Sequence, residues 1–495
     1  MSEALRPAWS TAALAIFAAA IVWVATPNGA GLQPDSIGYI RLARDLAAGA
    51  SIFELGTHWP PGYPLLLAVG TWVPGAELAT ARWVCVLSAG VTTIGLGFIL
   101  RDNLTGRLSG FVLPIVLLGL ILSPAFTQII WQALSEGPFI AALVWAVYAA
   151  LSFADRQRAG SLLLLCACIG LMSLLRYSFA PFMLAVLLGL LLTARHWHRH
   201  WQLLAIAGLL LAALPLLSWL GLSSSAGGPR QFSVHLVGMA HYRELANTFS
   251  LWLGFVPASL SIIVFVLSLL PAAVAWWTGR STVLALCLLM IGGYLAFLLV
   301  SISFMDAHTP LDARILSPLL PLWLVMQAVA VGQLSLIPAA RHAEAVFLVL
   351  LMLIVVAGLG NFSQQLSQAI RFGDGFADQR FRAAPVFSYV DELSPDQTVY
   401  TNAGEFFYLF YNRDTRQLPK LYNTQTGMLN PELGPEIESM LAALLETDGV
   451  VIWVDALAGR NYLPTVEYLD ERLPLDVVTR MNGGTVLKLS DVSSH

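Results

Sequence analysis

Long apolar stretches separated by short polar ones make up the first 360 residues. About 20 consecutive apolar residues are enough for a helix to cross the hydrocarbon core of a membrane. The pattern predicts eleven transmembrane helices, although ten or twelve also fit because several boundaries near 160–193 are soft. The predicted spans lie near residues 9–26, 78–100, 108–125, 135–153, 160–175, 177–193, 202–221, 251–277, 281–301, 315–335 and 343–360.

The polar segment between the first two spans also carries helical signals. Asp35 is a residue type that caps helix N-termini, and Gly49 is typical of the residue after a helix. Apolar positions between them form one stripe, which favours a helix lying on the membrane surface. The stripe consists of Ile37, Ile40, Ala43, Leu46 and Ala47. Residues 63–73 are apolar but too short to span, so we expect them to lie in the interface as well.

After residue 360 the pattern changes, because charged residues return and short strand-like runs alternate with helical ones. Strands are predicted at 398–401, 449–454 and 485–489, and helical segments at 376–393, 433–446 and 462–471. The chain therefore divides into a membrane part, 1–360, and a small soluble α/β domain, 361–495. The fold class predicted is a polytopic α-helical membrane protein with a C-terminal α/β domain on the outer face.

Composition supports a membrane protein and gives no sign of a nucleic-acid partner, so none is expected. Of the 495 residues, 57% are hydrophobic and only 11% are charged, whereas soluble domains have about 25% charged residues. The net charge is −4 and there is no basic run. The four cysteines all fall inside apolar stretches, which indicates buried thiols. The lipid bilayer is the one partner that composition implies.

The distribution of arginine predicts the orientation of the spans. Loops rich in Lys and Arg stay on the cytoplasmic side. Arginines gather on alternate loops, which places the N-terminus in the cytoplasm and, with eleven spans, the C-terminal domain outside. These arginines are Arg6, Arg101, Arg107, Arg156, Arg158, Arg195, Arg199, Arg280 and Arg341.

Four polar segments fall on the predicted outer side. A charge in lipid is costly, so ionisable groups at membrane depth usually have partners and functions. Arginine suits the phosphate of a lipid carrier, and a carboxylate beside it suits a general base for an acceptor hydroxyl. The candidates are Asp35, Tyr39, His58 and Tyr63 in the first segment, Glu136 in the second, Arg176 in the third, and Asp306, His308 and Arg314 in the fourth.

Each candidate also has a plainer interpretation. Asp35 alternatively serves only as a helix cap, and Arg314 pairs only with Asp312 or extends to the interface. Arg176 is an inner-face anchor if the adjacent span boundaries differ. Glu136 alternatively affects folding only. Ordinary interfacial or local hydrogen-bonding roles are the alternatives for Tyr39, Tyr63, His58 and His308. Neither histidine has a partner at helical metal-ligand spacing, so no metal site is indicated.

Taken in order, five short motifs resemble those of a known enzyme group. They are P-D-S-x-x-Y-x-x-L-A-x-x-L-A-x-G from Pro34, H-W-P-P-G-Y-P from His58, S-E-x-P-F from Ser135, L-R-Y from Leu175 and D-A-R-I-L-S-P-L-L-P from Asp312. The set is similar to the GT-C glycosyltransferases, and more narrowly to the bacterial dolichyl-phosphate-mannose–protein mannosyltransferase-like group that includes the lipid A aminoarabinose transferases. The resemblance covers residues from about 30 to 325, and segment 399–409 is also similar.

The resemblance implies an inverting glycosyltransferase of the bacterial inner membrane. Such enzymes take a sugar from a polyprenyl-phosphate carrier and pass it to a glycan, lipid or protein acceptor on the outer face. It assigns Asp35 as the catalytic base, Glu136 as a second acid, and Arg176 with Arg314 to the donor phosphate. Many relatives have paired acids in the first loop, whereas Ser36 stands beside Asp35 here. That departure leaves a divalent metal possible but not indicated.

Two other functions fit a membrane protein of this kind. A transporter or lipid flippase also has many spans and buried charges, but its charges lie near the midplane, often between inverted repeats. Here the candidate charges gather at one face and no repeat of fixed period is seen. A non-catalytic scaffold, whose outer domain binds a partner, is the third reading.

Overall fold

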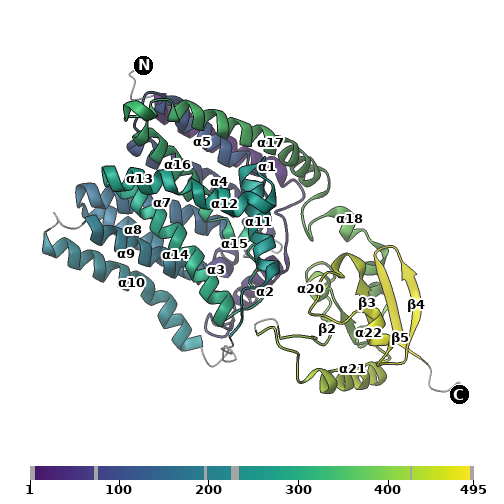
Figure 1. Ribbon diagram of the computed structural model, residues 1–495. Helices are drawn as coiled ribbons and strands as arrows, with labels where there is room; N and C mark the ends of the chain where they lie inside the picture. Colours follow the sequence, from purple (N-terminus) through teal and green to yellow (C-terminus); the bar gives the residue numbers. More distant parts are fainter. Residues whose placement is uncertain (1–5, 72–75, 194–197, 224–233, 424–425, 491–495) are drawn as a thin grey trace.

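The apolar stretches fold into a bundle of helices, and the C-terminal segment forms a smaller sheet domain beside one end of it (Figure 1). The computed structural model describes residues 6–71, 76–193, 198–223, 234–423 and 426–490. Arg195, one of the arginines used for the orientation, lies outside these residues. The backbone in lipid has no water to bond, so helices satisfy its polar groups internally. This is a multi-pass membrane protein.

The first half of the bundle runs from the N-terminus to the end of α10. Its helices are α1 (Arg6–Ala25), α2 (Pro34–Ala47), α3 (Gly62–Ala68), α4 (Ala76–Asn103), α5 (Ser109–Ile121), α6 (Pro124–Ile130), α7 (Glu136–Arg156), α8 (Ala159–Leu175), α9 (Phe179–Thr193) and α10 (Arg199–Ser223). The second half comprises α11 (Met239–Leu253), α12 (Ala258–Ser268), α13 (Leu270–Gly279), α14 (Thr282–Phe304), α15 (Ala313–Leu316), α16 (Leu319–Leu334), the 3-10 helix η2 (Pro338–Ala340) and α17 (Ala343–Phe372).

All eleven predicted spans coincide with helices. Within the described residues, six helical segments are long and apolar enough to cross a membrane, or seven if the bent pair α5 and α6 is one span. The remaining predicted spans correspond to shorter apolar helices, namely α1, α8, α9 and α16. Two boundaries were wrong. The span predicted at 108–125 bends by 60° between α5 and α6, where Pro124 cannot donate a backbone hydrogen bond. The span predicted at 251–277 begins only at Ala258, because α11 ends at Gly254, which has φ of +70°.

A buried acid joins two helices at the far end of the bundle from the sheet domain. The Glu344 side chain is in a residue only 3% exposed, and its Oε2 accepts hydrogen bonds from the backbone N–H groups of Arg107 and Leu108 at 3.0 and 3.1 Å. These N–H groups precede α5 and have no partner inside that helix. Glu344 therefore caps α5 from the start of α17.

The C-terminal domain contains one five-stranded mixed sheet. The strand order is β2-β1-β3-β5-β4, with β1 parallel to β2 and β3, and β5 antiparallel to β3 and β4. Its elements are α18 (Gln379–Arg382), α19 (Pro385–Ser388), η3 (Tyr389–Glu392), β1 (Val399–Thr401), α20 (Gly404–Tyr411), β2 (Arg416–Gln417), α21 (Leu433–Thr447), β3 (Val450–Val454), η4 (Asp455–Leu457), α22 (Val466–Asp470), β4 (Leu475–Met481) and β5 (Gly484–Leu489).

The central strand β3 shows why this domain has two cores. All five of its residues are buried. Val451 packs in a cluster with Met440 of α21 and Leu469 of α22. Ile452 points the other way, into a core that includes Phe406 of α20 and continues into the bundle. A continuous apolar strand is typical of a sheet covered on both faces, and here one of the two covers connects to the membrane part.

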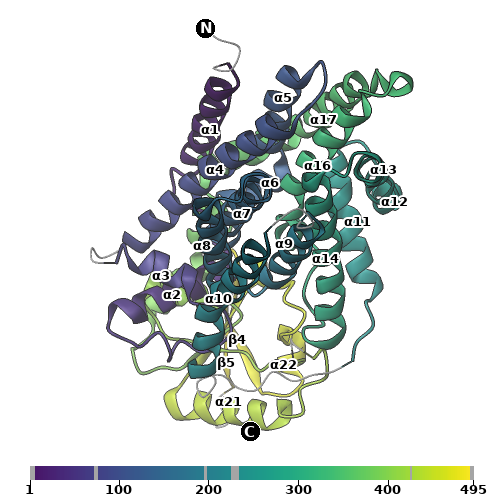
Figure 2. The ribbon, with the colours of Figure 1, turned by 90° about the vertical axis from the view of Figure 1, so that its left-hand side faces the viewer.

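The predicted surface helix exists as α2, but its start was assigned wrongly. The N-cap is Gln33, and Asp35 lies inside the first turn. The Gln33 backbone N–H donates to Ser36 Oγ at 3.0 Å, so a serine satisfies this helix end and the Asp35 carboxylate is not used as a cap. The helix ends as predicted, with Gly49 at φ of +98° just beyond it. Figures 1 and 2 show α2 and α3 at the end of the bundle that faces the sheet domain.

Candidate active site

Four charged side chains from distant parts of the chain meet at this end of the bundle. Arg314 Nη1 lies 2.7 Å from Asp35 Oδ2, and Arg314 Nε lies 3.4 Å from Glu136 Oε1. The same Glu136 oxygen forms an ion pair with Arg176. The result is a continuous chain in the order Asp35, Arg314, Glu136, Arg176. The structure therefore brings together all four charged residues that the sequence singled out first.

Burial differs along this chain of charges. The Glu136 side chain is 2% exposed and that of Arg176 17%, whereas Arg314 and Asp35 are 28% and 29% exposed. A buried carboxylate is tolerated only when it is paired, and Glu136 has two guanidinium partners. The Arg314–Asp35 pair is thus the more exposed of the two, Arg176 is partly exposed, and Glu136 is buried.

Local backbone structure explains where each charge sits. Glu136 is the first residue of α7, where the helix dipole favours a negative side chain. Arg176 follows α8 directly, in an extended conformation that ends the helix. Arg314 lies in α15, a single turn capped by Asp312, whose Oδ1 accepts from the Ile315 N–H at 2.9 Å. Asp312 is therefore used as a cap, and the reading in which Arg314 pairs only with Asp312 is wrong.

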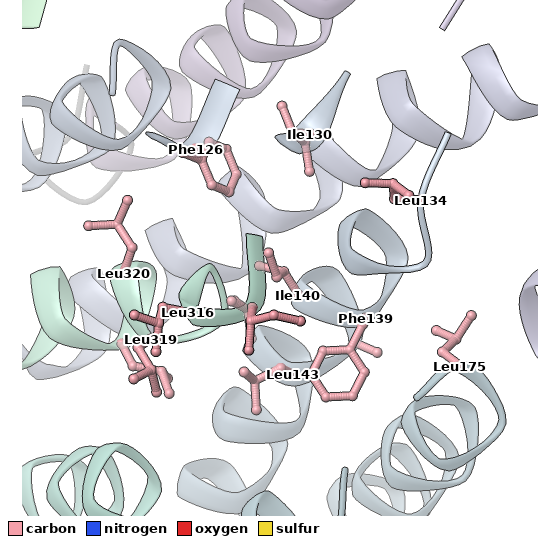
Figure 3. Close-up of a cluster of buried hydrophobic side chains, with 14 of the residues drawn as sticks. Phe126, Ile130, Leu134, Phe139, Ile140, Leu143, Leu175, Leu316, Leu319 and Leu320 are labelled. Carbon is pink, nitrogen blue, oxygen red and sulfur yellow. The ribbon is translucent and has the colours of Figure 1, made fainter. Parts of the chain in front are cut away.

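A dense apolar core holds these elements together beneath the charges. Figure 3 shows side chains from α6, α7, the end of α8, α15 and α16 packed against one another. Phe139 is one turn from Glu136, Leu175 is next to Arg176, and Leu316 is close to Arg314 in the chain; each is at most 1% exposed. Well-packed interiors transmit displacement rather than absorb it, so the charges rest on a rigid base.

Tyr39 and Ser135 extend the polar network. Tyr39 Oη lies 3.3 Å from Ser135 Oγ, which also accepts from Arg176 Nη1 at 3.5 Å and donates to Glu136 Oε2 at 3.5 Å. Burial, and then the Glu136 and Asp35 carboxylates, raise the pKa of Tyr39 above its usual value. The phenol therefore stays protonated and donates to Ser135. Burial alone disfavours the charged form of Arg314, but the Glu136 and Asp35 carboxylates outweigh it and raise its pKa.

The other two candidates from the first loop form an aromatic layer around Tyr39. The Tyr63 ring centroid lies 5.0 Å from that of Tyr39 in an edge-to-face arrangement, and Trp59 lies 5.2 Å from Tyr39. His58 packs edge-on against Trp59 at 4.3 Å. Tyr63 is fully buried, so it lies behind Tyr39 and orients it, while His58 lies further out along the loop.

Asp306 and His308 lie apart from the four charges. They belong to the loop between α14 and α15, where Asp306 Oδ1 accepts from the His308 N–H at 3.3 Å. The loop is held by α11, since His241 Nε2 lies 3.1 Å from the Ala307 carbonyl oxygen. A Cβ on Gly427 of the C-terminal domain would come within 3.2 Å of the His308 ring. These two candidates therefore mark a contact between the α14–α15 loop and the C-terminal domain.

The sequence reasoning missed Tyr294 as a member of the site. This tyrosine lies inside α14, is 1% exposed, and donates from Oη to the Ile315 carbonyl oxygen at 2.7 Å. It thereby fixes the turn that carries Arg314. A lone tyrosine inside an apolar span was the available signal, but α14 comes after many other spans and its neighbours in space could not be inferred.

Metal ligands do not accompany the carboxylates. Within the part of the chain that the structure describes, no group of three or more His, Cys, Asp or Glu residues is placed to hold an ion. Asp35 and Glu136 are instead separated by the guanidinium of Arg314.

Comparison with known proteins finds a similar family and a similar fold. Residues 58–219, about a third of the chain, match the model of the dolichyl-phosphate-mannose-protein mannosyltransferase family. The fold matches the crystal structure of ArnT from Cupriavidus metallidurans bound to undecaprenyl phosphate, with a TM-score of 0.59 at 14% identity, over 97% of this chain and 98% of that one. The chain therefore has the same fold as this ArnT structure, and part of it is similar to the mannosyltransferase family.

A second structure agrees. The apo form of the same ArnT matches with a TM-score of 0.57 at 15% identity, over 94% of this chain and 95% of that one. Among curated protein sequences none matches. At these identities the two structures show a shared fold, which extends over the bundle and the C-terminal domain alike. The predicted α-helical membrane bundle with a small C-terminal α/β domain is confirmed.

Proposed function

We propose that this protein is a glycosyltransferase, which moves a sugar from a polyprenyl-phosphate carrier to an acceptor on the outer face of the bacterial inner membrane and inverts the anomeric carbon. The observation that carries the proposal is the Asp35–Arg314 pair, nearly one-third exposed, backed by the more buried Glu136–Arg176 pair. A structural neighbour that is described as bound to undecaprenyl phosphate supports the carrier class. The N-terminus is then cytoplasmic and the C-terminal domain periplasmic.

Arg314 is the residue that meets the donor phosphate first. Its guanidinium is 28% exposed, and planar guanidinium groups bind phosphate oxygens in a fork. Its present partner on the open side is the Asp35 carboxylate, which a phosphate replaces. Arg176, behind Glu136, adds a second positive charge that is already desolvated. Both arginines then stabilise the phosphate as it leaves, which is the electrostatic role that often dominates catalysis.

Displacement from Arg314 frees Asp35 for the acceptor. A carboxylate within hydrogen-bond reach of a hydroxyl acts as general base. In the transfer, the acceptor oxygen forms a bond to the anomeric carbon as the bond from that carbon to the phosphate oxygen breaks. The hydroxyl proton passes to Asp35, and polyprenyl phosphate departs with the bonding electrons. If the acceptor is itself a phosphate, Asp35 orients it without removing a proton.

Glu136 has a different role from Asp35. At 2% exposure it is not open to substrate, and it holds Arg176 and Arg314 at fixed positions. We assign it as the acid that positions both phosphate ligands. His58, which is exposed, faces the donor or acceptor from the first loop, and the buried Tyr39 and Tyr63 support the site from behind. Asp306 and His308 contact the acceptor from the loop beside the C-terminal domain.

The test uses purified protein in lipid nanodiscs, radiolabelled polyprenyl-phosphate sugars and extracted envelope fractions. Wild-type protein is expected to label one fraction, and Asp35→Asn is expected to abolish the labelling. Asp45→Asn is the matched control, because Asp45 is an exposed acid at the other end of the same helix α2.

Two results would contradict the proposal. Wild-type labelling by Asp35→Asn would remove the base assignment. Absence of labelling with every donor, together with lipid movement across reconstituted vesicles, would favour the flippase alternative.

A further inference from the structure

Three chain segments meet in a small three-stranded arrangement, and two of them lie just before Asp35 and Glu136 in the sequence. Gly31 N–H donates to the Trp131 carbonyl at 3.0 Å, and Ala133 N–H donates back to the Gly31 carbonyl at 2.8 Å. On its other side, Leu32 N–H donates to the Asp374 carbonyl at 3.1 Å, and Phe376 N–H donates to the Leu32 carbonyl at 2.8 Å. The first-loop segment thus lies between the α6–α7 connection and the linker that leaves α17.

The side chain of Asp374 crosses this arrangement. Its Oδ2 accepts from Trp131 Nε1 at 3.1 Å and from Gln132 Nε2 at 2.8 Å. Trp131 is 2% exposed and Gln132 5% exposed. A buried donor that loses its acceptor is destabilising, so we expect the connection between α6 and α7 to shift if this carboxylate oxygen is removed.

Two glycines show how tightly the three segments are packed. A Cβ at Gly31 would lie 2.6 Å from Asp374 Oδ2, and one at Gly375 would lie 2.0 Å from the Leu32 carbonyl oxygen. Gly375 also has a backbone φ of +61°, a conformation that residues other than glycine rarely adopt. The backbone segments therefore approach at a distance that only glycine allows.

The arrangement lies immediately before both acids of the site. Leu32 precedes α2, whose first turn contains Asp35, and Ala133 precedes α7, which starts with Glu136. The same hydrogen-bonded set consequently fixes the starting point of each acid-bearing helix relative to the other. The third segment comes from the C-terminal side of the chain, directly after α17.

We propose that Asp374 is a positioning residue that sets the spacing of Asp35 and Glu136 through Trp131 and Gln132, and so couples the seating of the C-terminal domain to sugar transfer. This inference rests on the proposed function. Asp374 does not touch substrate; it acts through the backbone of residues 31–32 and 131–133. A displacement of about 1 Å at reacting groups costs about 10²-fold in rate, which gives the scale of its effect.

The experiment compares Asp374→Ala, Asp374→Asn and Glu344→Ala with wild type. An asparagine side-chain oxygen still accepts both hydrogen bonds, so Asp374→Asn is the conservative rescue. Glu344→Ala removes an acceptor of two hydrogen bonds at the opposite end of α17. That helix has 30 residues, so the two sites are about 45 Å apart. Glu344→Ala therefore reports a comparable structural loss far from the acids.

Three quantities are measured: kcat and donor KM, thermal unfolding, and hydrogen exchange of the backbone. For Asp374→Ala we expect kcat to fall about 10²-fold with little change in donor KM. Exchange is expected to become faster in peptides covering both 29–36 and 130–138. Asp374→Asn is expected to resemble wild type in all three. Glu344→Ala is expected to lower the unfolding temperature and leave kcat unchanged.

Several outcomes would overturn the proposal. One is wild-type kcat in Asp374→Ala despite faster exchange in both peptides. Another is an equal loss of kcat in Glu344→Ala, which would show a general folding effect. If Asp374→Ala does not fold, Trp131→Phe is used instead, because it removes one of the two donors to Asp374 and keeps an aromatic side chain. It should lower kcat while Gln132 still holds Asp374, and a wild-type kcat would refute the proposal.

Hydrogen exchange separates this proposal from the proposed function. If wild-type protein transfers no sugar, the proposed function fails, but exchange still reports whether Asp374 controls both acid-bearing segments. Faster exchange in both peptides would support the positioning role. Faster exchange confined to residues around 374–376 would overturn it.

Discussion

Replacing Asp35 with asparagine is expected to slow transfer and, at the same time, to strengthen binding of the donor phosphate. The structure places Asp35 Oδ2 2.7 Å from Arg314 Nη1, where the proposed mechanism puts the phosphate. Carboxylate and phosphate therefore compete for one guanidinium. Asparagine has nearly the same shape as aspartate but no charge to compete with.

The size of the two effects follows from exposure and role. Both partners of the pair are nearly one-third exposed, at 29% and 28%, and exposed ion pairs contribute about 0.2–1 kcal/mol. Removing that competition raises donor affinity by up to about fivefold, because 1.4 kcal/mol corresponds to tenfold. Loss of a general base lowers the rate by about 10²–10⁴-fold. The change in kcat should therefore be much larger than the change in affinity, and opposite in sense.

The assay measures binding of polyprenyl phosphate in nanodiscs beside the transfer rate, for wild type, Asp35→Asn and the control Asp45→Asn. Raising the salt concentration screens the Asp35–Arg314 ion pair. The gain in donor affinity of Asp35→Asn over wild type should therefore shrink at high salt. Weaker donor binding by Asp35→Asn would refute the competition, since it would mean that Asp35 itself contributes to holding the donor. A rate within twofold of wild type would refute the role of Asp35 in transfer.

Three further changes test other parts of the site. Glu136→Gln leaves Arg176 buried without a carboxylate, and we expect it to destabilise the protein by about 3–5 kcal/mol; denaturation in detergent checks this, and an unchanged midpoint would contradict the buried pair. Arg314→Lys should weaken donor binding and transfer, since an ammonium cannot fork between Asp35 and Glu136 or bind phosphate in a bidentate way; equal donor affinity would contradict that geometry. Tyr39→Phe removes one hydrogen bond, worth about 1 kcal/mol. The pKa of Tyr39 is raised, so its phenol does not ionise between pH 7 and its ordinary pKa of 10.0. The Tyr39→Phe protein should therefore keep the alkaline shape of the wild-type pH–rate profile. Loss of the alkaline limb in this variant would contradict a protonated Tyr39.

The sequence predicted the parts of the fold that depend on local pattern. Apolar runs located the helices of the bundle, and the surface helix ending at Gly49 was confirmed. The strands β1, β3 and β5 were found within a residue or two, while β2 and β4 were missed. β2 has only two residues, and β4 is largely exposed on the edge of the sheet. Neither strand alternates buried apolar and exposed polar residues, so pairing with a neighbouring strand defines it.

The candidate site shows the same division. Sequence reasoning selected Asp35, Glu136, Arg176 and Arg314 because charges at the edge of an apolar span are costly and therefore few. It assigned Asp35 as the cap of α2, but the N-cap is Gln33, whose backbone N–H bonds to Ser36. The position of a cap depends on where the backbone turns helical, and the sequence pattern does not locate that point to a single residue.

What the sequence determined by itself was the kind of molecule: how many apolar segments there are, which polar residues stand at their ends, and which chemistry those residue types allow. The tertiary structure decided which charge pairs with which. Asp35 and Arg314 are 279 residues apart, and Asp374 lies 242 residues from Gln132. Partners this distant are chosen by how helices pack around a shared core, and packing depends on contacts among all the segments at once. The placement of Asp35 and Glu136 around Arg314, and the contacts of Asp374, are therefore properties of the folded chain.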